Sequence, residues 1–103
     1  MLLSVLFSSA ATAAAIVVRG GSSCGQWVQE RSADGKPEAS NEFWLLGYMS
    51  GLAAASGTDA LRDTDAAYIE LWMDNYCKAN PLKRVDDGGD DLFIELKKKT
   101  RQQ

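Results

Sequence analysis

The two cysteines of this chain, Cys24 and Cys77, constrain its fold more than any other pair of residues. Neither belongs to a C-x-x-C motif, so a zinc site and thioredoxin-type redox chemistry are both poorly supported. In an oxidising compartment, two cysteines in a small domain are expected to form one structural disulfide. Closing a loop of this length stabilises a fold by about 4 kcal/mol on the chain-entropy model. The alternative is a pair of buried free thiols.

The first 18 residues favour export, because they carry no charge and begin with an apolar run. Small residues follow, and Ala11-Thr12-Ala13 matches the small-x-small pattern that signal peptidase reads. We expect residues 1–15 to be a signal peptide, cleaved near Ala13 or Ala15, and residues 16–103 to be a single periplasmic or secreted domain. A membrane anchor is the rival interpretation. Serines and a threonine dilute the segment, so no membrane span is expected after cleavage.

The sequence contains no histidine, which removes the commonest general base and the commonest metal ligand. Without histidine, neither a Ser-His-Asp nor a Cys-His catalytic arrangement can form, and the chain has no G-x-x-x-x-G-K-[ST] phosphate loop. A net charge of −3 gives no electrostatic footprint for nucleic acid. We therefore expect a protein that is not an enzyme, has no cofactor and does not bind nucleic acid.

The densest polar cluster is Asp86-Asp87-Gly88-Gly89-Asp90-Asp91. Four carboxylates could bind calcium, but the EF-hand spacing is absent and no glutamate closes the loop. Paired carboxylates also serve glycosidases, yet these adjoin one another without the separate, enclosed environments that such catalysis needs. We expect a solvated helix segment and no metal site.

Helical periodicity over the rest of the chain predicts an all-α domain of four helices stapled by one disulfide. The first helix is expected over residues 24–31 with Ser23 as its N-cap, and the second over residues 41–55. One short N-terminal strand or extended arm at residues 16–18 is a further expectation, since these residues are β-branched.

The third helix is expected from Thr64 or Asp65 to about Ala79. Asn80-Pro81 ends it and can open the fourth helix, which runs to about Lys99 with an interruption at Gly88-Gly89. Leu82 is then the first apolar residue of the fourth stripe, which continues through Val85, Leu92, Phe93 and Leu96.

Two kinds of residue are candidates for contact surfaces. Gly47 and Gly51 lie four apart in the second helix, where glycine costs about 1 kcal/mol, so we expect another backbone to pack closely there. Large aromatic residues at helical spacing are more often core than binding surface. Phe43 and Tyr68 fall off the best apolar stripes, and with Tyr48 they form the candidate protein-binding or dimer surface.

Three short segments carry recognisable motifs: Ser23-Cys24-Gly25-Gln26-Trp27-Val28, Trp44-x-x-Gly47-Tyr48-Met49-Ser50-Gly51 and Tyr76-Cys77-Lys78-Ala79-Asn80-Pro81-Leu82. In this order they resemble small exported bacterial proteins of the HdeA acid-stress chaperone type. The Gly47-Tyr48-x-x-Gly51 element and the Asn80-Pro81 helix start are also similar to exported immunity proteins that neutralise type VI secretion amidase toxins.

The chaperone resemblance implies a helical fold with its cysteines joined, a homodimer at neutral pH, and apolar surface that acid exposes to hold unfolding proteins. Protonating all 14 acidic side chains would move the charge of −3 towards +11, enough repulsion to loosen a small dimer. The expected function is therefore non-enzymatic binding of another protein as a periplasmic stress chaperone. The alternative is an immunity or inhibitor protein that binds one cognate toxin or enzyme.

Overall fold

Four α-helices dominate the computed structural model, which describes Ser4, residues 16–32 and residues 39–101. They are α1 (Cys24–Ser32), α2 (Ala39–Ser56), α3 (Ala66–Ala79) and α4 (Val85–Arg101). The all-α prediction is confirmed. The expected signal peptide over residues 1–15 lies, apart from Ser4, outside the described residues.

The first and third helices begin at the caps that the sequence indicates. The Ser23 hydroxyl accepts a hydrogen bond from the backbone N–H of Gln26 at 3.1 Å, and the Asp65 carboxylate accepts one from Tyr68 at 2.8 Å. Each cap satisfies a backbone donor that the first helical turn leaves free. α1 and α3 are thereby fixed at their starts.

The predicted start of the fourth helix is wrong by about one turn. Asn80 instead caps the end of α3, its N–H donating to Tyr76 O at 2.8 Å, and the chain then makes a turn before α4 begins at Val85. Asp87 accepts a hydrogen bond from the Arg84 backbone N–H at 2.9 Å, which caps α4 from within its first turn. Leu82 therefore lies in the turn rather than on the apolar stripe.

Close packing occurs at a different glycine pair from the one expected. Gly47 and Gly51 are exposed, and a Cβ at either would meet no atom within 4 Å, so no described element packs against them. A Cβ at Gly88 would instead lie 2.7 Å from Met73 Sδ and from Tyr76 Cδ1. The interruption expected at Gly88-Gly89 does not occur, and α4 runs through both glycines. Their missing side chains instead let α4 approach α3 and α2 closely.

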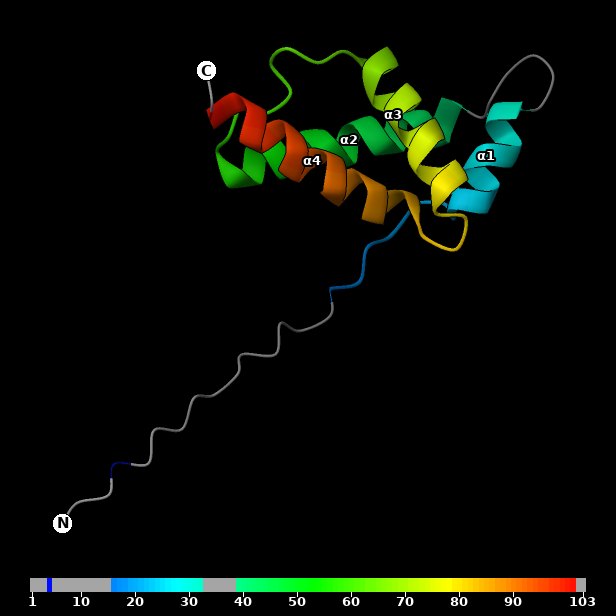
Figure 1. Cartoon of the computed structure of the whole chain (residues 1–103), viewed down its shortest axis with the longest axis horizontal. Helices are drawn as coiled ribbons and strands as arrows, with labels where there is room; N and C mark the ends of the chain where they lie inside the picture. The colour runs from blue at the N-terminus through cyan, green and yellow to red at the C-terminus, as the bar shows by residue number, and fades with distance from the viewer. Residues whose placement is uncertain (1–3, 5–15, 33–38, 102–103) are drawn as a thin grey trace.

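Two pairings of helices enclose the core: α1 packs against α3, and α2 packs against α4 (Figure 1). α3 also contacts α4, which joins the pairs. The C-terminal end of α4 lies at the opposite end of the domain from α1 (Figure 1). The buried apolar residues come from all four helices and the loop before α3: Cys24, Trp27, Leu45, Met49, Ala60, Ile69, Met73, Cys77, Val85, Leu92, Phe93 and Leu96.

The arm before α1 is extended but forms no strand within residues 16–32. Its one sheet-like feature is an isolated antiparallel bridge between Ser23 and Arg84. Gly20 has a φ of 95°. The backbone carbonyl of the preceding residue, Arg19, accepts a hydrogen bond from Trp44 Nε1 at 3.0 Å. A side chain at Gly20 would collide with the Trp44 indole, so the arm lies against α2 only because it has glycine there.

Candidate protein-binding surface

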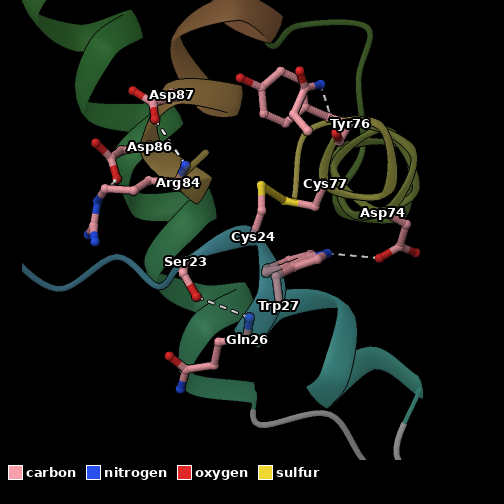
Figure 2. Close-up of a disulfide and its surroundings, with 11 residues drawn as sticks. Ser23, Cys24, Gln26, Trp27, Asp74, Tyr76, Cys77, Arg84, Asp86 and Asp87 are labelled. Carbon is pink, nitrogen blue, oxygen red and sulfur yellow. Dashed lines mark hydrogen bonds and ion pairs between the residues drawn. A yellow bond between two sulfur atoms is a disulfide. The ribbon is translucent and has the colours of Figure 1, made fainter. Parts of the chain in front are cut away.

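Cys24 and Cys77 form the disulfide that the sequence predicts, and not the alternative pair of free thiols. The bond joins the first turn of α1 to the last turn of α3 (Figure 2). Both cysteines are fully buried, and the Cα atoms are 4.7 Å apart. Trp27 packs beside the bridge, and its indole N–H donates to the Asp74 carboxylate at 2.9 Å (Figure 2). The disulfide is therefore shielded from solvent, and the indole N–H of Trp27 beside it is hydrogen-bonded.

Arg31 links three helices at the far end of α1. Its Nε donates to Asp74 Oδ1 at 2.8 Å, and its Nη1 donates to Glu42 Oε1 at 2.7 Å. The two carboxylates raise the pKa of the guanidinium above its usual value, the hydrogen bond to Asp74 being the largest cause. The cation is therefore permanent, and the junction of α1, α2 and α3 depends on the two carboxylates staying ionised.

A third carboxylate, that of Glu70 on α3, borders the same junction. Its partial burial raises its pKa first of all, and the neighbouring charge of Glu42 raises it further, while Arg31 acts in the opposite direction. Glu70 is thus the group at this junction whose ionised form the fold disfavours.

The solvent-facing side of α2 carries no charge. Glu42 is the only charged residue of this 18-residue helix, and its carboxylate is held inward by Arg31. From Phe43 onward, five exposed residues share an arc of about 100° on the side of α2 that faces away from the core, and we call them the outer α2 face. They are Phe43, Gly47, Ser50, Gly51 and Ala54.

Phe43 dominates this face, because 70% of its side chain is exposed. The glycines beside it leave open space, since no heavy atom lies within 4 Å of where their Cβ atoms would be. Surface helices normally place charged or polar residues opposite their buried side. The outer α2 face instead presents an aromatic ring above an almost flat, uncharged backbone.

The three aromatic residues expected to form one surface do not come together. Tyr48 lies about 140° around α2 from Phe43, where its ring stacks on Trp44 with centroids 5.1 Å apart. Its hydroxyl donates to Asp90 of α4 at 2.5 Å. Tyr68 contacts Lys99, nine residues further along α4 than Asp90, or about 13 Å. Only Phe43 belongs to the outer α2 face.

Burial raises the pKa of the Tyr48 phenol, and the hydrogen bond to Asp90 raises it further. Burial likewise raises the pKa of Tyr76, with the charges of Asp91 and Asp87 as the next causes. Both phenols therefore stay neutral at physiological pH and act as fixed hydrogen-bonding or packing groups between α4 and its neighbours.

The acidic start of α4 shows no metal-binding geometry. Asp86 pairs with Arg84 at 2.9 Å, Asp87 caps the helix and Asp90 holds Tyr48 (Figure 2 shows the first two). Over residues 16–32 and 39–101, no group of three or more acidic or cysteine side chains is arranged to hold a metal ion. In the same part of the chain, no helix combines the length and apolar character needed to cross a membrane.

The sequence patterns missed three exposed apolar residues. Leu82 is 99% exposed, Leu71 60% and Ile94 52%. Leu71 and Ile94 lie on helix faces that are otherwise polar. A helical-wheel projection of each helix would have predicted their exposure. For Leu82 the signal was Asn80-Pro81, which the structure uses to end α3 and enter a turn rather than to begin α4.

Comparisons with protein-family models, with curated proteins and with solved structures found no match to this chain. The residues and the geometry above are therefore the basis of any functional assignment.

Proposed function

We propose that this chain is an exported, non-enzymatic protein-binding domain that acts as a stress chaperone and contacts unfolding clients through the outer α2 face. The observation that carries the proposal is the uncharged surface around Phe43, 70% exposed on a helix whose single charge points inward. An apolar face without charges can meet unfolded apolar segments without desolvating an ion.

The disulfide supports an exported location, because such bonds persist in oxidising compartments. The uncharged segment at the start of the sequence supports it too. At neutral pH we propose that a second copy covers the outer α2 face, in keeping with the dimer that the family resemblance implies. The face carries no charge, so a symmetric contact brings no like charges together.

The Arg31 junction supports a response to acid. Its two ion pairs join α1 to α2 and α3, and both are lost when carboxylates are protonated. The overall charge rises at the same time from −3 towards +11. Mutual repulsion then opposes both dimer association and compact packing, which frees the apolar face for clients.

The test is suppression of client aggregation by the purified chain at pH 7 and at about pH 3, below the usual carboxylate range. We expect light scattering from an acid-denatured client to fall with the unmodified chain at pH 3. Gly51→Lys should abolish the effect, because the added side chain has room and keeps its charge in acid. Leu71→Ser, an exposed apolar residue on α3, is the matched control and should behave as the unmodified chain.

Equal suppression by Gly51→Lys and the unmodified chain would exclude the outer α2 face as the client site. A single stoichiometric partner bound at pH 7, with no suppression at pH 3, would instead favour the inhibitor or immunity function.

A further inference from the structure

The solvent-facing side of α4 is divided by charge along its length. Four charged residues and one isoleucine share an arc of about 120° there, and we call these five residues the outer α4 face. They are Asp90, Asp91, Ile94, Lys97 and Lys98. Lys97 is half-buried, and the other four are exposed. The outer α4 face is therefore acidic in its first half, apolar at its centre and basic in its second half.

The charges of the outer α4 face are not neutralised by ions of the same chain. None of its four charged residues takes part in an ion pair of the described part of the chain. The Asp90 carboxylate accepts its hydrogen bond from the uncharged phenol of Tyr48. Asp91 and Lys97 lie about 9 Å apart along the helix axis, which is too far for them to pair with each other. A partner would therefore meet both signs of charge on this face.

The helix macrodipole explains only part of this pattern. It favours acidic side chains in the first turn of a helix and basic side chains in the last turn. Since α4 begins at Val85, Asp90 and Asp91 lie in its second turn, beyond that effect. The macrodipole also gives no reason for an apolar residue between the charges, yet Ile94 is 52% exposed there.

Ile94 is the centre of symmetry of the outer α4 face. When two copies of a helix pack antiparallel about one residue, each residue before it faces the residue equally far after it in the partner. Asp91 precedes Ile94 by three residues, and Lys97 follows it by three. Asp90 and Lys98 lie four residues before and after it. Every charge of the face would thus meet the opposite charge, and Ile94 would meet the partner's Ile94.

The match continues for one more turn at both ends of the face. Asp87 precedes Ile94 by seven residues and Arg101 follows it by seven, on the same side of the helix. Arg101 is exposed and takes part in no ion pair of the described residues. A parallel arrangement of two copies would instead place acidic against acidic and basic against basic halves. Only the antiparallel arrangement therefore brings opposite charges together.

We propose that the outer α4 face is a self-association surface, on which α4 of a second copy packs antiparallel with the two Ile94 side chains at the twofold axis. The contact uses a different helix from the outer α2 face and does not depend on the chaperone function. α4 is about 25 Å long, so one pair of such helices forms a small interface. We expect a weak dimer that dissociates as salt screens its exposed charges.

Sedimentation equilibrium of the Gly51→Lys chain at pH 7 isolates this contact, because a like charge in both copies then opposes pairing of the outer α2 face. We expect a dimer at low salt whose dissociation constant rises at least tenfold at high salt. A Gly51→Lys chain that stays monomeric at low salt would overturn the proposal.

Ile94→Lys, added to Gly51→Lys, tests the centre of the contact. It should weaken the dimer at least tenfold, since two ammonium groups would meet at the twofold axis. Leu71→Lys is the matched control, because Leu71 is a comparably exposed apolar residue on α3, and it should weaken the dimer less than twofold. Equal losses for the two variants would contradict the proposed contact.

A charge swap tests the antiparallel arrangement. Lys97→Glu with Lys98→Glu makes the face wholly acidic, and Asp90→Lys with Asp91→Lys makes it wholly basic. Neither variant should self-associate, whereas an equal mixture should form a mixed dimer at least as tight as that of the parent, since all four facing pairs are again opposite in charge. A mixture that stays monomeric rules out the arrangement. Circular dichroism checks the helices of each variant, and Ile94→Lys decides if one fails to fold.

The chain with Gly51 unchanged reports on the two faces together. Two different twofold contacts on one chain join more than two copies, so an assembly larger than a dimer is expected. A dimer that Gly51→Lys retains and Ile94→Lys abolishes would support the outer α4 face alone. A dimer that Gly51→Lys abolishes and Ile94→Lys retains would overturn the α4 contact and leave the proposed α2 dimer standing.

Discussion

The guanidinium of Arg31 meets the carboxylate of Asp74 at two points, with Nε 2.8 Å from Oδ1 and Nη2 2.9 Å from Oδ2. This parallel geometry is the strong form of an arginine–carboxylate pair. Trp27 Nε1 donates to the same Oδ1, so one carboxylate of α3 binds two residues of α1. The end of α1 is thereby fixed by polar contacts, as its start is fixed by the disulfide.

Arg31→Met should lower the free energy of unfolding by about 2 kcal/mol at pH 7, between the costs of breaking an exposed and a buried pair. The reason is that the side chains of Asp74 and Glu42, 16% and 19% exposed, would keep their charges without a cation. Urea denaturation measures the change. Arg62→Met is the control, because the Arg62–Asp63 pair is long and exposed, and it should cost less than about 0.5 kcal/mol. Equal losses for the two variants would contradict the role given to Arg31.

Glu70→Gln should stabilise the fold at pH 7. Because the pKa of Glu70 is raised in the folded state, its ionised form costs stability above that pKa, and the cost disappears as pH falls through it. Glu70 therefore makes the unfolding free energy of the unmodified chain decline as pH rises from the usual pKa of glutamate to the raised pKa of Glu70. Denaturation curves for both proteins at pH 4 and pH 7 should show the gain of Glu70→Gln at pH 7 only. A gain of equal size at both pH values would rule out this account.

Gly88→Ala and Gly47→Ala should change stability in opposite directions. Both variants replace a helical glycine by alanine, and this gain in helix propensity by itself stabilises the folded state by about 1 kcal/mol. At Gly88 the new methyl group would lie 2.7 Å from the Tyr76 ring, which is stacked on Trp72 and cannot easily move. We expect a net loss of about 1–2 kcal/mol there, since overpacking a core typically costs about 1–3 kcal/mol.

At Gly47 the methyl group meets nothing within 4 Å, so the propensity gain should appear almost in full. Thermal unfolding of the two variants beside the unmodified chain gives the sign of each effect. A stabilised Gly88→Ala would mean that α4 does not approach α3 as closely as described.

Replacing both cysteines by serine should lower the unfolding free energy by about 4 kcal/mol, the chain-entropy value for a separation of 53 residues. Two buried hydroxyls replace the bridge and add to the loss, since both positions are fully buried. Chemical denaturation of the variant is the measurement, and the unmodified chain under a reducing agent is the control. Unchanged stability in both would show that the bridge does not constrain the unfolded chain.

Much of the fold follows from local patterns in the sequence. The Ser23 and Asp65 caps and the stripe of Ile69, Met73 and Cys77 act within one helix, so periodicity and capping chemistry predict them. The position of Gly88 against Tyr76 depends on how α3 and α4 cross, which neither helix encodes by itself. Gly47 and Gly88 are both helical glycines in the sequence, and only the packing of the helices distinguishes their roles.

The candidate surface was harder to predict than the fold. The sequence predicts Phe43 at a contact surface because it falls off the apolar stripe, and the structure leaves it exposed. Asn80-Pro81 can both end one helix and begin the next, so the sequence alone places Leu82 on the fourth helix. Two hydrogen bonds decide in favour of the turn: Cys24 donates to the turn, and Val85 donates to the arm. Each joins residues about 60 positions apart in the sequence, so no local pattern reveals it.

The bridge between Cys24 and Cys77 also divides the polypeptide topologically. It closes a covalent ring that contains α1, α2 and α3 up to Cys77, while α4 and the N-terminal arm remain outside. A mechanical load applied to the two chain ends would therefore be carried across the sulfur atoms and would bypass the ring. Such a load could pull away only the arm and α4, and the ring would keep its contour length for as long as the sulfur–sulfur bond remained intact.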